Sequence, residues 1–274
     1  MPDSAHLLAG AVSGMASTVI LQPLDLIKTR LQESTSVTKY QDKSLGLRRF
    51  WRGTLPSVCR NVPGTALYFM TLERLKNQVT TNPNLKFLTS EGKPSHTGNL
   101  ALGSVSRSAI GFVMMPLSVL KVRFESSGYQ YSGMFSGLAE IFRGEGLRGL
   151  FKGYAATVLR DAPFAGLYVV FYEKGKLLLN ATFPTSNMAP NMIAGLLAGT
   201  SATLITQPFD MLKTRIQLEP QVYKSIWNGA NVIISRNGFG AFFKGSFPRV
   251  LRKTLSSAIT WTIYEELVKR SKFI

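Results

Sequence analysis

The chain alternates between long apolar stretches and shorter basic ones. Three stretches are almost free of charge and long enough to cross roughly 30 Å of hydrocarbon as helices. Three more are shorter and rich in aromatic and small residues. The long stretches are His6–Gln22, Asn99–Leu120 (with Arg107 as its only charge) and Ala189–Phe209, and the shorter ones are Asn61–Leu72, Ala162–Tyr172 and Thr254–Tyr264. The pattern predicts six membrane helices.

Composition separates a membrane protein from a soluble basic one. Lys and Arg number 32 against 15 Asp and Glu, which gives a net charge of +17. That charge suits a nucleic-acid binder as well as a membrane protein that faces anionic lipid and solutes. However, 45% of the residues are apolar and only 17% are charged, and no zinc motif or aromatic–basic interleaving is present. We therefore expect a membrane protein with no nucleic-acid partner.

The sequence contains few residues of the kind that enzymes use, and its N-terminus does not resemble a cleaved targeting signal. Its two histidines, His6 and His96, lie near an end or a loop, and the single Cys59 excludes a disulfide framework. No nucleophile triad or metal-ligand spacing is visible, so we expect no catalytic residue, no metal and no cofactor. The N-terminal residues resemble neither a signal peptide nor an Arg-rich transit peptide, so any delivery signal should be internal.

Three motifs recur along the chain in the same order. The first is Pro23–Arg30, Pro116–Arg123 and Pro208–Arg215; the second is Phe50–Gly53, Leu150–Gly153 and Phe242–Gly245; the third is Leu72–Glu73, Tyr172–Glu173 and Tyr264–Glu265. The prolines are 93 and 92 residues apart. One such motif occurs by chance, but nine in register indicate repeats, which we place at 1–89, 90–182 and 183–274. Each should form a long helix kinked at its proline, a basic loop with a short helix, and a second long helix.

This pattern resembles the mitochondrial carrier family over essentially the whole chain. The tripled Pro-x-[Asp/Glu]-x-x-[Lys/Arg]-x-[Lys/Arg] motif is the signature of that family. The resemblance implies an all-α membrane protein, in which six tilted transmembrane helices form a monomeric pseudo-threefold barrel with short matrix helices. It also implies the mitochondrial inner membrane, with both termini toward the intermembrane space.

Charges beside the prolines should pair between helices, because an ion inside a membrane is costly unless it is paired or wet. The resemblance pairs Asp25 with Lys121, and Asp210 with Lys28, to close the matrix side of the pore. Ser118 stands where the third acid belongs, opposite Lys213. The predicted matrix gate comprises Asp25, Lys28, Lys121, Asp210 and Lys213, with Gln32, Glu125 and Gln217 in the bracing position. Whether Glu125 replaces the missing acid is left open here.

A second network is expected at the cytosolic mouth. The residues that the resemblance assigns to it are Glu73 with Lys76, Glu173 with Lys176, and Glu265. Val268 stands where the third repeat should have a lysine, so this gate is also incomplete. Two incomplete gates predict modest closing energies on both sides, which suits alternating access. The alternative is that these ions are only solvated helix ends.

The substrate site is expected halfway through the membrane, on the second helix of each repeat and between the two gates. Arg60, Arg160 and Arg252 each lie thirteen residues before the glutamate of the third motif. Each arginine needs an anion or water in an otherwise apolar helix. The predicted substrate-binding residues are Arg60, Asn61, Gly64, Arg160, Asp161 and Arg252.

The dipeptide Arg160-Asp161 favours an amino acid as substrate. A zwitterion needs a cation for its carboxylate and an anion for its ammonium, and Arg offers a planar fork to a carboxylate. Within the family, Arg followed by an acid at this point resembles the amino-acid branch. The middle repeat, with Arg107 and Ser118, resembles the branch that imports glycine for haem synthesis. Mutual neutralisation of Arg160 and Asp161, a keto or dicarboxylic acid substrate, and a carrier-fold scaffold or receptor without transport remain alternatives.

The second motif places a basic residue and a glycine before a helix. The residues are Arg52, Gly53, Lys152, Gly153, Lys244 and Gly245. The free backbone N–H groups at a helix start favour a phosphate, and the matrix surface is expected to be basic. We therefore predict that these residues bind lipid, with cardiolipin headgroups as the ligands. The alternative is that each glycine serves only the turn.

Overall fold

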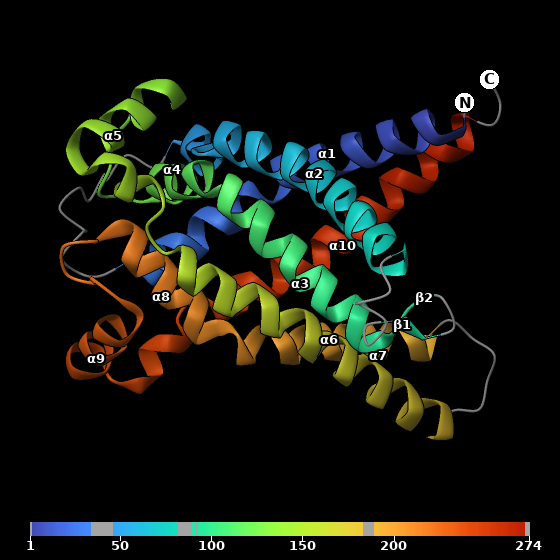
Figure 1. Cartoon of the computed structure of the whole chain (residues 1–274). Helices are drawn as coiled ribbons and strands as arrows, with labels where there is room; N and C mark the ends of the chain where they lie inside the picture. The colour runs from blue at the N-terminus through green and yellow to red at the C-terminus, as the bar shows by residue number, and fades with distance from the viewer. Residues whose placement is uncertain (1, 34–45, 82–88, 91–92, 183–188, 272–274) are drawn as a thin grey trace. The chain divides into compact units, whose positions relative to one another are not determined.

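The computed structural model describes residues 2–33, 46–81, 89–90, 93–182 and 189–271, and almost all of these are helical (Figure 1). The elements are α1 (Pro2–Gln32), the 3-10 helix η1 (Leu47–Trp51), α2 (Thr54–Thr81), β1 (Thr89–Ser90), β2 (Lys93–Pro94), α3 (His96–Val113), α4 (Met115–Glu125), α5 (Met134–Leu150), α6 (Tyr154–Thr182), α7 (Ala189–Ile205), α8 (Gln207–Leu218), α9 (Ile226–Asn237), the 3-10 helix η3 (Phe239–Phe243) and α10 (Ser246–Ser271). The strands β1 and β2 pair antiparallel.

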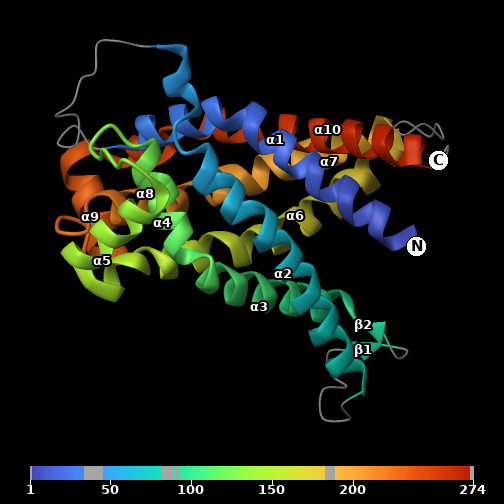
Figure 2. The ribbon, with the colours of Figure 1, turned by 90° about the horizontal axis from the view of Figure 1, so that it is seen from above.

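The chain divides into two compact units. The first unit comprises residues 1–63, 115–153 and 211–274, and the second comprises residues 64–114 and 154–210. In the first unit α1 packs along α10, and both views place the start of α1 and the end of α10 at the same end (Figure 1, Figure 2). The Ser17 and Ser256 hydroxyl oxygens lie 2.9 Å apart across this contact. Small side chains thus let the first and last helices approach closely.

In the second unit α6 packs against both α3 and α7. The Tyr154 hydroxyl donates to the Ser108 carbonyl over 3.0 Å, which ties the start of α6 to α3. On α6, the Tyr168 ring stacks on Tyr172 at 6.1 Å between centroids. The hydroxyl of Tyr168 lies against Gly195 of α7. These contacts hold α6, which carries Arg160 in its second turn, against α3 and α7.

The motif prolines act differently in the three repeats. Because proline lacks an N–H and clashes with the preceding turn, we expected a kink at each. The helix breaks at Met114, two residues before Pro116, and at Thr206, two residues before Pro208. In the first repeat α1 continues through Pro23 without a break.

Membrane-spanning length and hydropathy are clearest for the first helix of each repeat. Among the described residues, Gly10–Gln32 is long and apolar enough to cross a membrane as one helix. The bent pairs α3–α4 and α7–α8 are long and apolar enough when each pair is counted as one span. The second helices α2, α6 and α10 are 28, 29 and 26 residues long, which is sufficient length. The polar and charged residues of α2, α6 and α10 make these helices less apolar than an ordinary membrane span. This is expected of helices with one face toward water.

A glycine with positive φ precedes each second helix. Gly53, Gly153 and Gly245 have φ of 87°, 78° and 78°, and α2, α6 and α10 begin at the next residue. Side chains with a Cβ rarely adopt this left-handed conformation, so the turn itself calls for glycine. The second motif therefore marks the point where the chain enters the second helix of each repeat.

Candidate functional site

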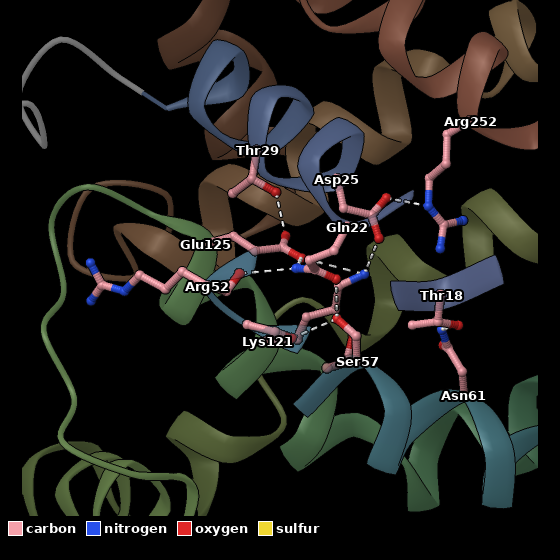
Figure 3. A network of polar contacts seen from close by, with 12 residues as sticks. Thr18, Gln22, Asp25, Thr29, Arg52, Ser57, Asn61, Lys121, Glu125 and Arg252 are labelled. Carbon is pink, nitrogen blue, oxygen red and sulfur yellow. Dashed lines mark hydrogen bonds and ion pairs between the residues drawn. The ribbon is translucent and has the colours of Figure 1, made fainter. Parts of the chain in front are cut away.

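The densest polar network in the first unit surrounds Asp25 on α1 (Figure 3). The Lys121 ammonium of α4 donates to Oδ2 of Asp25 over 2.6 Å. The guanidinium of Arg252, from α10, forms an ion pair with the other oxygen, Oδ1. One carboxylate therefore joins three helices, and it uses a separate oxygen for each cation. The expected contact between Asp25 and Lys121 is present, and Arg252 joins it.

Glu125 at the end of α4 belongs to this same network (Figure 3). Its side chain is 2% exposed and accepts hydrogen bonds from Gln22 Nε2 over 3.0 Å and from Thr29 Oγ1 over 2.7 Å. The Lys121 ammonium lies 3.5 Å from its Oε1. Gln22 in turn accepts from the Ser57 hydroxyl over 2.9 Å. Glu125 thus shares Lys121 with Asp25, and these contacts do not involve Ser118.

The position equivalent to Asp25 in the second repeat has different chemistry. The Lys213 ammonium of α8 donates to the Ser118 hydroxyl over 3.1 Å. Ser118 is 4% exposed and Lys213 is 5% exposed. A lysine and a hydroxyl therefore meet in a buried place where the first repeat has a lysine and a carboxylate.

The bracing residues connect the motif helices to the glycine turns. Gln32 accepts from the Thr214 hydroxyl over 2.8 Å, and Gln217 donates to the Lys152 carbonyl over 3.3 Å. Gln22 donates to the Arg52 carbonyl over 3.0 Å. Each of the three bracing residues, which we call braces, lies against one of the turn glycines. A Cβ added to the glycine would contact its brace, which is Glu125 at Gly53, Gln217 at Gly153 and Gln32 at Gly245. Each turn thus rests on the brace of the following repeat.

The basic residues predicted to bind lipid differ in their surroundings. The Arg52 guanidinium donates to the Tyr129 carbonyl, Lys152 is half-buried, and Lys244 is exposed. Burial raises the pKa of the Tyr129 phenol above its usual value, so this hydroxyl stays protonated as it donates to the Leu218 carbonyl over 2.6 Å. Lys244 is the most accessible of the three, and the lipid role stays a prediction.

In the second unit, Arg160 on α6 binds two carboxylates. Its Nε lies 2.7 Å from Asp161 Oδ1, and its Nη1 lies 2.9 Å from Asp210 Oδ1. Asp210 is 1% exposed at its side chain. The sequence predicted Arg160 beside Asp161, but not the contact with the motif aspartate. Arg160 thus joins its sequence neighbour to the motif aspartate of α8.

The remaining predicted substrate residues lie close together on α2, although the boundary between the two units falls after Pro63. Asn61 of the first unit donates to the Thr18 hydroxyl over 3.2 Å, and Arg60 beside it is half-buried. Gly64 falls in the second unit, where a Cβ would lie 3.5 Å from Met114 Cγ. Their common role in binding stays a prediction.

The side chains of the predicted cytosolic gate that the structure describes are more exposed than those around Asp25. Glu73 and Glu173 are exposed, Lys176 is exposed and Lys76 is half-buried. The side chain of Glu265 lies outside the described residues. For the matrix gate, Lys28 belongs to the first unit and Asp210 to the second. Both the cytosolic gate and the pair of Lys28 with Asp210 therefore stay predictions.

Three residues that donate to the bracing residues were missed in the sequence: Gln22, Thr29 and Thr214. Thr29 and Thr214 both donate to a brace. They occupy the seventh position of the proline motif, where the second repeat has Val122. This shared position was the available signal.

All three repeats match one known family. Residues 2–83, 92–182 and 184–272 match the family described as Mitochondrial carrier protein. The chain belongs to the mitochondrial carrier family. Membership in this family means a transporter of the mitochondrial inner membrane, not an enzyme.

Several fungal carriers are similar to this one over most of its length. A protein of Emericella nidulans is 42% identical, with 97% of this chain and 88% of the relative covered. One of Ajellomyces capsulatus is 39% identical, with 97% and 88% covered. One of Pyricularia oryzae is 41% identical, with 98% and 92% covered. Each of the three is named mitochondrial glycine transporter.

Proposed function

We propose that this carrier moves glycine across the mitochondrial inner membrane, into the matrix, by alternating access. The observation that carries the proposal is the cluster of Arg160, Asp161 and Asp210. Asp161 offers a carboxylate to an ammonium group, and the hydrogen bond from the half-buried Arg160 holds that carboxylate in a fixed orientation. The names of the similar fungal proteins support glycine as the amino acid.

In this proposal Asp161 binds the substrate ammonium and Arg160 positions Asp161. The Asp25–Lys121 pair with Glu125 closes the matrix side, because separating these buried charges requires their rehydration. Opening exposes the charges to matrix water, which lowers that cost. The cytosolic network of Glu73, Glu173 and Glu265 would close the other side in turn.

We extend the proposal to the membrane setting. The protein acts as a monomer, its termini face the intermembrane space, and Gly53, Gly153 and Gly245 present helix starts to cardiolipin phosphates. The resemblance of the middle repeat to the glycine-importing branch supports haem synthesis as the use of the glycine.

The test is uptake of radiolabelled glycine into liposomes that contain the purified protein. Serine, lysine and 2-oxoglutarate are measured in parallel, and Asp161→Asn is compared with Glu140→Gln, an exposed carboxylate on α5. We expect glycine uptake that falls about tenfold or more in Asp161→Asn, since losing one charged hydrogen bond has roughly this effect, and that persists in Glu140→Gln.

Other outcomes would reject the proposal in different ways. Uptake of 2-oxoglutarate without any amino acid would identify an anion carrier and assign the arginines to a dianion. Uptake of no solute by a folded protein would support the scaffold or receptor. Equal glycine uptake in Asp161→Asn and Glu140→Gln would remove Asp161 from the site.

A further inference from the structure

Pro23 deprives one backbone carbonyl of α1 of its usual donor. In an α-helix the N–H of each residue donates to the carbonyl four residues earlier, and proline has no N–H. For Pro23 that carbonyl belongs to Val19. The indole Nε1–H of Trp51, at the end of η1, donates to the Val19 carbonyl over 2.9 Å. A side chain from another element thus supplies the hydrogen bond that Pro23 cannot make.

The residue equivalent to Trp51 has no such donor in the other two repeats. The second motif aligns Trp51 with Phe151 and Phe243, whose phenyl rings carry no N–H. In those repeats the helix breaks at Met114 and at Thr206, and its two parts bend by 67° and 50°. The motif proline is present in all three repeats, yet α1 alone is continuous through it. The indole donor therefore distinguishes the continuous helix from the broken ones.

The turn after η1 holds the indole beside the proline. α1 packs against η1, and the side-chain amide of the buried Gln22 donates to the Arg52 carbonyl over 3.0 Å. This second hydrogen bond joins the residue after Trp51 to the residue before Pro23. Val19 lies within the candidate span Gly10–Gln32. Because no water replaces a lost backbone hydrogen bond inside a bilayer, the donor from Trp51 matters more there than it would in solution.

The consequence falls on Asp25, which follows Pro23 by two residues. Its two carboxylate oxygens bind Lys121 and Arg252, so a bend before Pro23 would move the carboxylate relative to both cations. We propose that Trp51 is a positioning residue for the matrix gate: its indole N–H keeps α1 continuous past Pro23 and so holds Asp25 between Lys121 and Arg252. This inference rests on the proposed function, in which Asp25 and Lys121 close the matrix side.

The experiment measures the shape of α1 with two spin labels, one on each side of the proline. The labels are attached at Val12→Cys and Leu31→Cys, two exposed positions of α1, after the single cysteine has been removed by Cys59→Ser. Along a continuous helix these positions lie about 28 Å apart. Trp51→Phe installs the ring that the other repeats have. We expect it to shorten the distance by about 3 Å or more, as a bend like theirs would do.

Two further variants tie the result to the hydrogen bond. Trp227→Phe removes an indole from an exposed position on α9 and should leave the distance unchanged. Pro23→Ala restores a backbone N–H that can itself donate to the Val19 carbonyl. In that background Trp51→Phe should therefore have no effect on the distance, because both changes act on one hydrogen bond.

Glycine uptake into liposomes then tests the role in transport. Trp51→Phe should lower the initial rate of uptake about threefold or more, as the loss of one neutral hydrogen bond would do, and it should not lower the rate further in the Pro23→Ala background. The unfolding temperatures should follow the same pattern. A loss of folding in Trp51→Phe that Pro23→Ala does not relieve would therefore overturn the inference.

Three other results separate the steps of the inference. An unchanged distance in Trp51→Phe, or the same shortening with and without Pro23, would show that the indole does not replace the missing donor. A shortened distance with an unchanged uptake rate would remove Trp51 from the positioning of Asp25. An unmodified protein that takes up no glycine would instead reject the proposed function, while the distance measurement would still decide what the indole does.

Discussion

The first and second repeats share the sequence motif but surround it with different chemical groups. In the first, Asp25 bridges Lys121 and Arg252, and Thr29 donates to the brace Glu125. In the second, the equivalent positions are Ser118 and Val122, and the brace is Gln217. Among the described side chains, the buried Oε1 of Gln217 has no hydrogen-bond partner.

The difference shows which parts of the repeat are structural and which are open to change. Both repeats keep the glycine turn, which sets the backbone path into the second helix, and both keep the proline and the lysine of the motif. In the second repeat, the neutral Ser118 stands in place of the carboxylate and Val122 in place of the threonine.

The largest expected effect comes from removing the carboxylate of the first repeat. Asp25→Asn leaves Lys121 and Arg252 beside each other with one neutral oxygen between them, and breaking a buried pair costs about 3 kcal/mol. We expect the unfolding temperature of the detergent-solubilised protein to fall by about 6 °C or more, and glycine uptake to fall with it. Ser118→Ala, which removes one neutral hydrogen bond, should lower stability by about 1 kcal/mol. Similar losses in both variants would mean that the two repeats do not differ as described.

The fold could be predicted from the sequence because the same motifs occur three times along the chain. Nine motif matches and six apolar stretches gave the all-helical carrier architecture that the family match confirms. The proline was a weaker guide, since the helix breaks before Pro116 and Pro208 but α1 continues through Pro23. A missing backbone hydrogen bond permits a break, and the surrounding packing decides whether one forms.

The candidate site was less predictable, because pairing depends on three-dimensional position. The Arg160-Asp161 dipeptide was visible, but the contacts of Arg160 with Asp210 and of Arg252 with Asp25 join residues far apart in sequence. The sequence left open where Glu125 acts, and only the contacts with Gln22 and Thr29 place it beside Asp25. Thr29 lacks charge and was overlooked, although its position in the motif repeats.

Substitutions at Gly53 and Gly153 test whether the first and second repeats share the same turn geometry. A Cβ at Gly53 would lie 3.1 Å from Glu125 Cγ, and one at Gly153 would lie 3.1 Å from Gln217 Cγ, with positive φ at both. Strain in the left-handed region together with this crowding should make Gly53→Ala and Gly153→Ala each cost about 2 kcal/mol. Gly146→Ala, with positive φ but open space, should cost about 1 kcal/mol. A difference above about 1 kcal/mol between the first two would contradict a common turn geometry.

A smaller effect should follow from giving the second-repeat brace the side chain found in the other repeats. Glu125→Gln keeps an acceptor for Thr29 but removes the charge near Lys121 and places an amide beside Gln22 Nε2. We expect a loss of about 1.5 kcal/mol, measured as a lower unfolding temperature. Glu140→Gln on the exposed face of α5 should leave that temperature unchanged. No loss in Glu125→Gln would show that its charge is not needed beside Lys121.

The smallest expected effect is a gain in stability. It should follow from giving the second repeat the threonine hydroxyl that the other two repeats have at the seventh position of the motif. Thr29 donates to Glu125 and Thr214 donates to Gln32, whereas Val122 at the same motif position has no hydroxyl to offer Gln217 Oε1. Val122→Thr has nearly the same shape and supplies that donor. We expect it to stabilise the protein by about 1 kcal/mol, which corresponds to a rise of about 3 °C in the unfolding temperature. The reverse change in the third repeat, Thr214→Val, should lower it by a similar amount. If Val122→Thr destabilises the protein, then the hydroxyl does not reach Gln217, and the motif helices do not place this position alike in the three repeats.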